Sequence, residues 1–326
     1  MFALTGRTTA DYVQLVRLDP FYNIRFEDGS VFHYNGNMDA LVQQVRAFNP
    51  DDVEGFLRFS ASTEEIFNKG FGLIDKPFHK FGEMIKAAPD LVRLQSHKSV
   101  AAYVNQYMKD ERLRQVFSFH PLLIGGNPFS STSIYALIHH LEKKWGVWFA
   151  MGGTGALVKG MTSLFTDIGG ELRLSSEVRA IEVSDTTRRA TGVRLVNGEV
   201  LPADAVVSNG DLAHTYMKLI DPRFRSHNTD RRLARKKYSM SLFVSYFGTD
   251  RQYPEMAHHE IIMGPRYKGL LHDIFDRKVL SDDFSLYLHR PTATDPALAP
   301  EGCDGFYVLS PVPNLLGSTN WEASAE

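Results

Sequence analysis

The chain carries no Asp, Glu, Lys or Arg between Gln115 and Leu141. Such a run is long enough to cross a bilayer as a helix. However, a Gly-Gly-Asn-Pro segment at 125–128 interrupts it, and glycine and proline both weaken helix interiors. A membrane-spanning helix is therefore a poor candidate. Two readings stay open: a pair of core helices joined by a turn, or an apolar wall that lines a tunnel or rests on a membrane surface.

The overall composition is that of a globular protein. The 326 residues are 43% hydrophobic and 23% charged, which is enough chain for about two domains. Lys and Arg number 36 against 38 Asp and Glu, so no basic excess exists to hold a phosphate backbone, and we expect no nucleic-acid partner. A single cysteine, Cys303, excludes an intramolecular disulfide and a cysteine-based zinc site.

The first half of the chain predicts strands followed by helices. Residues 1–48 hold β-branched and aromatic runs, and Asp28-Gly29 in FEDGSVF predicts a hairpin turn. At Asn49 a helical region begins, with Asn49 as the cap and Pro50 at the first helical position. The helical pattern continues to residue 146. We expect residues 49–146 to form a helical subdomain.

The second half predicts alternating strands and helices. Residues 147–211 read as a strand, a helix over 154–168, strands over 171–178 and 180–185, a hairpin around Asn197-Gly198, and a buried strand from residue 204. Residues 212–326 read as a basic helix over 231–237 followed by strands. Those strands are predicted at 241–248, 258–263, 284–289 and 306–312.

Simple motifs for phosphate or metal are weak here. Gly153 and Gly155 match the start of a dinucleotide-binding loop, but Val158 takes the place of the third glycine. Two histidine pairs occur, at 139–140 and 258–259. Adjacent residues on one helix or strand do not face a common metal, so we expect solvated or core histidines at both pairs.

Longer stretches carry a family resemblance. The segment WFAMGGTGALVKGMTSLFTDIGGELRLSSEVRAIEV and the later GVRLVNGEVLPADAVVSNGD resemble the middle of the FAD-containing amine-oxidase superfamily. Four further stretches resemble the bacterial phytoene desaturases within it. They are PFYNIRFEDGSVFHY, FNPDDVEGF, FSFHPLLIGGNPFSSTSIYALIHHLE and SLYLHRPTATDPALAPEGCDGFYVLSPVPNL. One departure is Ala150, where the family usually has proline. The family's opening GxGxxG turn and closing Gly-rich segment are not in this sequence, so we expect an internal fragment.

The resemblance implies a fold and a cofactor. The fold is α/β: an incomplete FAD-binding Rossmann-like half, a mixed β-sheet substrate domain and a helical subdomain. Residues 1–48 and 212–326 would belong to the substrate domain, and residues 147–211 to the FAD-binding domain. FAD would be contacted at the Gly152-Gly153 turn and by Glu177 and Val178 at the end of the strand predicted over 171–178. The alternative for Glu177 and Val178 is a plain sheet position.

The resemblance also implies an activity, namely flavin-dependent desaturation of phytoene toward lycopene or a related carotene, with the chain alone expected to be inactive. Two alternatives stay open: another flavoprotein of the superfamily (a carotenoid isomerase, an oxidase or a retinol saturase), or a non-catalytic module that binds a hydrophobic ligand or a membrane. Phytoene, a C40 polyene, resides in membranes, so peripheral contact at the cytoplasmic face of the membrane is expected. A homo-oligomer is left open.

Glu83 and Lys86 are the candidate catalytic residues. A cation-like transition state in a polyene would be stabilised by a carboxylate, which could also accept a proton. The two side chains stand about one helical turn apart in FGEMIKAAP, amid apolar neighbours. The alternative is an ordinary exposed ion pair at i, i+3.

Overall fold

The computed structural model describes residues 1–74 and 88–324 and divides into two compact units. Unit 1 combines residues 1–161 with 239–326, and unit 2 is the continuous segment 162–238. Each unit is described by itself below. The division falls within helix α7 (Thr154–Asp167). Unit 2 begins and ends later than the segment 147–211, whose assignment to the FAD-binding domain stays a prediction.

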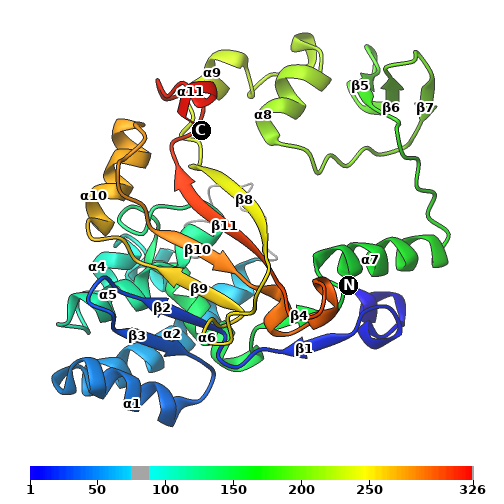
Figure 1. Ribbon diagram of the computed structural model, residues 1–326. Coiled ribbons are helices and arrows are strands. Elements are labelled where there is room, and N and C mark those ends of the chain that lie inside the picture. The colour runs from blue at the N-terminus through cyan, green and yellow to red at the C-terminus, as the bar shows by residue number, and fades with distance from the viewer. Residues whose placement is uncertain (75–87, 325–326) are drawn as a thin grey trace. The chain divides into compact units, whose positions relative to one another are not determined.

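Unit 1 is built on a six-stranded mixed sheet in the order β3-β2-β9-β10-β11-β8 (Figure 1). All neighbours run antiparallel except β2 and β9, which run parallel. The strands are β2 (Tyr22–Arg25), β3 (Val31–Tyr34), β8 (Ser241–Thr249), β9 (His259–Ile262), β10 (Leu286–His289) and β11 (Asp304–Val312). The predicted β2–β3 hairpin is confirmed, with Gly29 at φ +81°, a conformation that a side chain disfavours. The four predicted C-terminal strands are confirmed with it.

Helices supply the rest of unit 1. They are α1 (Met38–Phe48), α2 (Val53–Ile74), α4 (Val100–Val104), α5 (Glu111–Ser118), α6 (Leu137–Trp145), the first half of α7, α10 (Tyr267–His272) and α11 (Trp321–Ser324). Aromatic side chains from the β2–β3 hairpin, α2 and α5 form the core, including Phe32, Tyr34, Phe56, Phe59 and Phe117. Rings of this size bury much apolar surface each, so this cluster is the main source of stability in unit 1.

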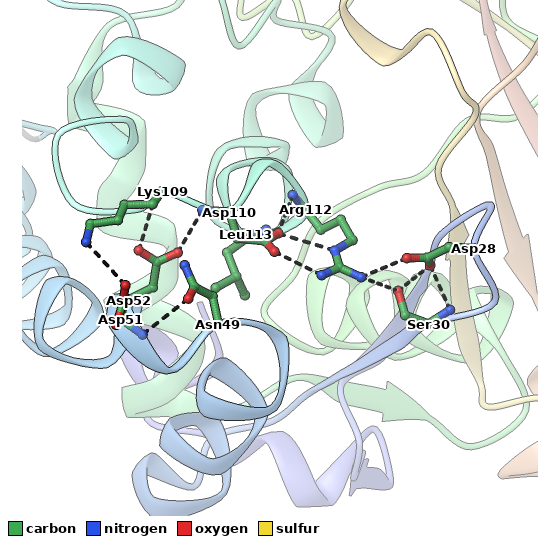
Figure 2. A network of polar contacts seen from close by, with 9 residues as sticks. All are labelled: Asp28, Ser30, Asn49, Asp51, Asp52, Lys109, Asp110, Arg112 and Leu113. Atoms are coloured by element: carbon green, nitrogen blue, oxygen red, sulfur yellow. Dashed lines mark hydrogen bonds and ion pairs between the residues drawn. The ribbon is translucent and has the colours of Figure 1, made fainter.

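Buried polar contacts fix the start of α5 against the start of α2 (Figure 2). The fully buried Asp52 carboxylate accepts hydrogen bonds from the backbone N–H groups of Lys109 (2.7 Å) and Asp110 (2.8 Å). Asp110 in turn caps α5, and Arg112 links it to Asp28 in the hairpin turn. The predicted cap at Asn49 is confirmed, since its side chain accepts from the Asp51 N–H.

A short two-stranded ladder completes unit 1. Strands β1 (Leu15–Arg17) and β4 (Trp148–Ala150) pair antiparallel, with Leu15 opposite Ala150. Directly after β4, Gly152 and Gly153 both adopt left-handed φ angles (+83° and +79°) before α7 begins. The chain therefore turns sharply from strand to helix at the Gly-Gly pair, as its sequence predicts.

Unit 2 contains a three-stranded meander, β5 (Val178–Val183), β6 (Ala190–Leu195) and β7 (Val200–Pro202). Gly198 at φ +91° forms the predicted hairpin turn between β6 and β7. The unit also holds the second half of α7 and two short helices, α8 (Leu212–His214) and α9 (Asp230–Ala234).

Three predictions about unit 2 are wrong. Residues 171–177 are irregular, because Ser175 adopts φ +52° and interrupts an extended strand. Residues 204–209 form no strand, and Val207 is 93% exposed; a strand needs a neighbour to pair with, and the described residues provide none there. Helix α9 ends at Ala234, whereas the sequence predicts a helix to residue 237. Several basic side chains lie within these two turns, and their mutual repulsion disfavours a longer helix.

Candidate functional site

Unit 1 encloses an apolar cavity of about 380 Å³ between its sheet and the segments that flank α5 and α6. Strands β8 to β11 form one wall, and Phe119, Leu122 and Leu123 from the charge-free run form part of the other. The lining residues are Tyr22, Phe119, Leu122, Leu123, Glu142, Val147, Met240, Leu242, His259, Ile261, Met263, Tyr267, Ser285, Leu286, Tyr287, Leu309 and Pro311. The surface that these side chains present to the cavity is mostly hydrocarbon, so the cavity suits a ligand without polar groups.

The charge-free run thus fulfils parts of both predictions. It forms helical segments, with Phe117 and Phe119 in the core, and it contributes wall residues to the cavity. Within the part of the chain that the structure describes, no helix is long and apolar enough to cross a membrane.

A carboxylate and a tyrosine partner lie on the cavity wall, and a buried histidine contacts both of them. Glu142, on α6, is only 7% exposed. The Tyr22 hydroxyl donates to Glu142 Oε2 at 2.9 Å, and His120 Nε2 lies 3.4 Å from the same oxygen and 3.1 Å from the Tyr22 hydroxyl. Because both partners surround one oxygen, the site can hold a negative charge or a proton at Glu142 in an otherwise apolar wall.

The electrostatics around this carboxylate keep the nearby tyrosines Tyr22 and Tyr34 neutral. Burial, together with the negative charge of Glu142, raises the pKa of Tyr22 and of the stacked Tyr34 well above the usual tyrosine range. Burial lowers the pKa of His139, which is hydrogen-bonded to Tyr34, well below the usual histidine range. Glu142 is thus bordered by the neutral hydroxyl of Tyr22, which donates to it.

A second hollow, a groove of about 500 Å³, lies beside the Gly152-Gly153 turn. Its walls are mainly aromatic, including Phe149, Phe247, Phe306 and Tyr307. A Cβ atom added to Gly153 would meet nothing within 4 Å, so the turn leaves open space for a flat ligand to approach the backbone.

The turn itself is held by hydrogen bonds within the protein. Gly152 N–H donates to Asp295 Oδ2 at 2.7 Å, and Gly153 N–H donates to the Ala150 carbonyl at 2.9 Å. Since both amide groups are engaged, the turn is suited to packing against a ring system and does not offer these N–H groups to a phosphate.

The other predicted cofactor residues belong to unit 2. Val178 is the first residue of β5, paired with Leu195, and the Glu177 carbonyl accepts from the Val196 N–H at 2.9 Å. The Glu177 side chain is exposed, and its carboxylate has no hydrogen-bond partner among residues 1–74 and 88–324. It is therefore available to a ligand hydroxyl. Glu83 and Lys86 lie outside the described residues, and their proposed role stays a hypothesis.

Residues 1–296 match the model of the family described as flavin containing amine oxidoreductase. The chain belongs to this family. It is 48% identical to the lycopene-forming phytoene desaturase of Pseudescherichia vulneris over 97% of the chain and 64% of that protein. It is 46% identical to the lycopene-forming phytoene desaturase of Pantoea ananas over 100% of the chain and 66% of that protein. The chain therefore spans about two thirds of the length of these relatives.

Solved structures agree with the fold. An oxidoreductase from Methanosarcina mazei matches 96% of the chain with a TM-score of 0.59 at 13% identity. A protein from Pyrococcus furiosus matches 99% with a TM-score of 0.60 at 14% identity. At these identities the likeness concerns the α/β fold alone, and that predicted fold class is confirmed.

Membership in the flavin containing amine oxidoreductase family implies FAD as the cofactor, as the sequence predicted. Within unit 1, the aromatic groove beside Gly153 suits the flat ring system of such a group. In unit 2, taken by itself, the exposed Glu177 carboxylate can accept a hydrogen bond from a hydroxyl. The individual assignments of Gly152, Gly153, Glu177 and Val178 stay predictions.

Sequence reasoning missed several residues of the site. Glu142 appears in the sequence only as the end of a charge-free run, and its partner Tyr22 is 120 residues away. One signal was available: Glu142 lies three residues after His139 and so on the same face of α6. The expectation that His258 and His259 cannot face a common centre is wrong. Because His258 precedes β9, strand alternation does not separate the two rings, and their centroids lie 4.4 Å apart.

Proposed function

We propose that the chain forms the polyene-binding part, and some of the flavin-binding part, of an FAD-dependent phytoene desaturase that acts toward lycopene or a related carotene. The observation that carries the proposal is the apolar cavity with a single carboxylate, Glu142, in its wall. The two relatives that are 48% and 46% identical to the chain over 97% and 100% of its length are named lycopene-forming phytoene desaturases. We propose the same activity for this chain, and it stays a proposal because the chain covers only about two thirds of the length of each relative.

The cavity supports a polyene substrate on energetic grounds. A C40 hydrocarbon has no polar group, so its affinity must come from apolar area removed from water, at roughly 25 cal/mol per Å². A cavity of 380 Å³ in unit 1 holds only a segment of such a molecule. One end of the cavity wall includes Leu123, whose side chain is 58% exposed. The remainder of the polyene would therefore continue beyond the described wall.

The residues divide the chemistry of hydrogen removal. FAD, when bound, would supply the hydride acceptor. Removal of a hydride leaves positive character on the polyene, which a carboxylate in a low-dielectric wall stabilises, and the second hydrogen leaves as a proton. Glu142 can accept that proton at Oε2, where Tyr22 and His120 hold the oxygen in place. The apolar wall around it excludes water.

The proposed desaturase activity can be tested in a chimaera with a longer relative. We would replace the matching two thirds of the Pseudescherichia vulneris enzyme with residues 1–326 and express the chimaera in bacteria that accumulate phytoene. The expected result is a flavin-containing chimaera that forms lycopene or a related carotene, identified by chromatography. A folded chimaera with bound FAD that leaves phytoene unchanged would contradict the proposal, and an isomerised or oxygenated product would favour another flavoprotein of the superfamily.

A matched pair of substitutions tests the cavity itself. Leu309→Trp places a larger side chain in the cavity wall, whereas Val92→Trp adds the same side chain at an exposed site. In the chimaera, Leu309→Trp should lower carotene formation at unchanged FAD content, and Val92→Trp should not. Equal carotene formation by the two variants, with normal circular dichroism, would exclude this cavity as the substrate site.

We also propose peripheral membrane contact at the cytoplasmic face, made near the cavity. Leu123 and Ile124 are more than half exposed, and they precede Gly125, which lies against Ser239. Ser239 accepts a hydrogen bond from Asn314, directly before the exposed Leu315 and Leu316, so two apolar tips share this region. Apolar tips of this kind favour insertion at the lipid interface.

Liposome sedimentation tests this contact. Leu123→Asp with Ile124→Asp should reduce the sedimented fraction, whereas Leu4→Asp with Val92→Asp, which are also exposed, should not. Because all four side chains are exposed, folding should be unaffected, and circular dichroism checks this. Equal sedimentation of both double variants would argue against the contact.

A homo-oligomer stays a prediction, to be tested by light scattering.

A further inference from the structure

Three histidine rings gather where β9 and β10 pair. His259 stands directly opposite His289 in the antiparallel register, and their Nδ1 atoms are 3.1 Å apart. His258, immediately before β9, places its ring 4.4 Å from that of His259 and 4.7 Å from that of His289, centroid to centroid. Each histidine can contribute one ring nitrogen to a set whose members all lie within 4.8 Å of one another.

A tyrosine oxygen joins the same cluster. The Tyr287 hydroxyl lies 2.7 Å from His259 Nδ1 and 3.4 Å from His289 Nδ1. These two nitrogens and the oxygen therefore form a triangle with edges of 2.7 to 3.4 Å. A neutral imidazole Nδ1 has either one hydrogen or one lone pair, so His259 Nδ1 cannot fully satisfy two such neighbours at once.

The triangle has the dimensions of ligands around one metal ion. Tetrahedral ligands at about 2.0–2.1 Å from zinc are separated by about 3.3 Å from one another. The three edges in the protein scatter around that length. A bound cation would also resolve the competition at His259, because each lone pair would point to the ion.

His258 supplies the independent observation. Its side chain is only 5% exposed, and its Nδ1 is engaged with the Thr294 hydroxyl at 2.6 Å. Its Nε2 is buried and has no hydrogen-bond partner within the described part of the chain. A buried polar atom without a partner is costly, and histidine ligands typically have their second nitrogen held by a hydrogen bond, as Thr294 holds this one.

We propose that His258, His259 and His289, with the oxygen of Tyr287, form a binding site for one divalent transition-metal ion of the zinc class. Nitrogen-rich sites of this kind favour Zn²⁺, Co²⁺ or Cu²⁺ over Mg²⁺ or Ca²⁺. Desolvation lowers the pKa of His258 to about 3, of His259 to about 2 and of His289 to about 4, so all three rings are neutral and able to coordinate at neutral pH.

The proposed metal site can be reached from both the apolar cavity and the groove beside Gly153. His259 lines the apolar cavity, and His289 lines the groove beside Gly153. The ion would tie β9 to β10 at this point and would fix Tyr287 in the cavity wall. This inference concerns the chain's own residues and stands independently of the proposed desaturase activity.

The test uses the full 326-residue chain, stripped with EDTA and titrated with Co²⁺ and Zn²⁺. The expected result is one Co²⁺ per chain with the intense visible absorption of tetrahedral cobalt, displaced by Zn²⁺. His258→Gln and His289→Gln should abolish that absorption, and Thr294→Val should weaken affinity by about 10-fold or more. The exposed His272→Gln serves as the matched control and should bind like the parent.

Two results would overturn the inference. The first is a folded parent chain that takes up neither ion at micromolar concentrations. The second is unchanged cobalt absorption in His289→Gln. Circular dichroism establishes folding in each case, and Tyr287→Phe, which removes only a hydroxyl, provides a gentler variant. Loss of affinity in Tyr287→Phe with retained folding supports the site even if a histidine variant does not fold.

Discussion

Gly55, near the start of α2, offers a sharp test of how the helices of unit 1 are fitted together. A Cβ atom added there would lie 1.8 Å from the Tyr107 carbonyl oxygen and 2.9 Å from its carbon. The backbone of that turn would have to move by more than an ångström. The two residues that follow Met108 donate their N–H groups to Asp52, three residues before Gly55, so the same movement strains both hydrogen bonds.

The expected cost of Gly55→Ala follows from these contacts. Overpacking costs about 1–3 kcal/mol, and each weakened hydrogen bond adds about 0.5–1.5 kcal/mol. Alanine gains about 1 kcal/mol over glycine in a helix interior, which offsets part of this. The free energy of unfolding should therefore fall by about 1–5 kcal/mol. Helix propensity alone predicts the opposite sign.

Gly70→Ala, in the same helix, is the matched control. Its added Cβ would meet Leu137 and Ile134 side chains at 3.5 and 3.6 Å, which is ordinary van der Waals contact. We expect it to be neutral or to stabilise by up to about 1 kcal/mol. Urea unfolding followed by circular dichroism measures both variants. If Gly55→Ala is as stable as the parent, the close approach of α2 to Tyr107 is refuted.

Three further predictions concern the site. In the chimaera, Glu142→Gln should lower turnover about 100-fold or more at unchanged FAD content, because an amide cannot accept the proton; near-parental turnover would remove Glu142 from that role. Asp295→Ala leaves the Gly152 N–H without an acceptor and should lower the free energy of unfolding by about 1–3 kcal/mol and weaken FAD retention, measured by urea unfolding and flavin absorbance; unchanged values would contradict this. In EDTA, stability should fall as pH drops from about 6.5 toward 4, because the unfolded chain takes up protons that the folded histidine cluster does not, at about 1.4 kcal/mol per pH unit for each proton. His289→Gln should flatten that slope and the exposed His272→Gln should not; identical slopes would refute the assignment.

Local signals predicted most of the individual elements. Asp28-Gly29 specified the β2–β3 hairpin, and Asn49 specified the start of the helical region, because turns and caps depend on a few neighbouring residues. The buried strand predicted from residue 204 depends on an apolar run alone, and residues 204–209 do not form it. A strand's stability comes from its partner, which is a long-range property that an apolar run does not reveal.

The site itself depends on pairings that no local pattern encodes. No local pattern marks Glu142, because its partner Tyr22 lies on strand β2, 120 residues earlier in the chain. The predicted strand over 258–263 includes His258, whereas β9 begins at His259, so the alternation of strand side chains does not apply to His258. The family resemblance predicted the cofactor, but it did not predict the histidine cluster.

The parallel pairing of β2 with β9 has a consequence for biosynthesis. Asn23 on β2 bonds to Glu260 on β9, 237 residues later in the chain. At about 5–20 residues per second, a ribosome needs roughly 10–50 seconds between the two strands. During that time β2 of the nascent chain is an open sheet edge, and Arg25 lacks its carboxylate partner. Because such long-range contacts also slow folding, the yield of soluble protein should depend on chaperones that occupy this edge until β9 emerges.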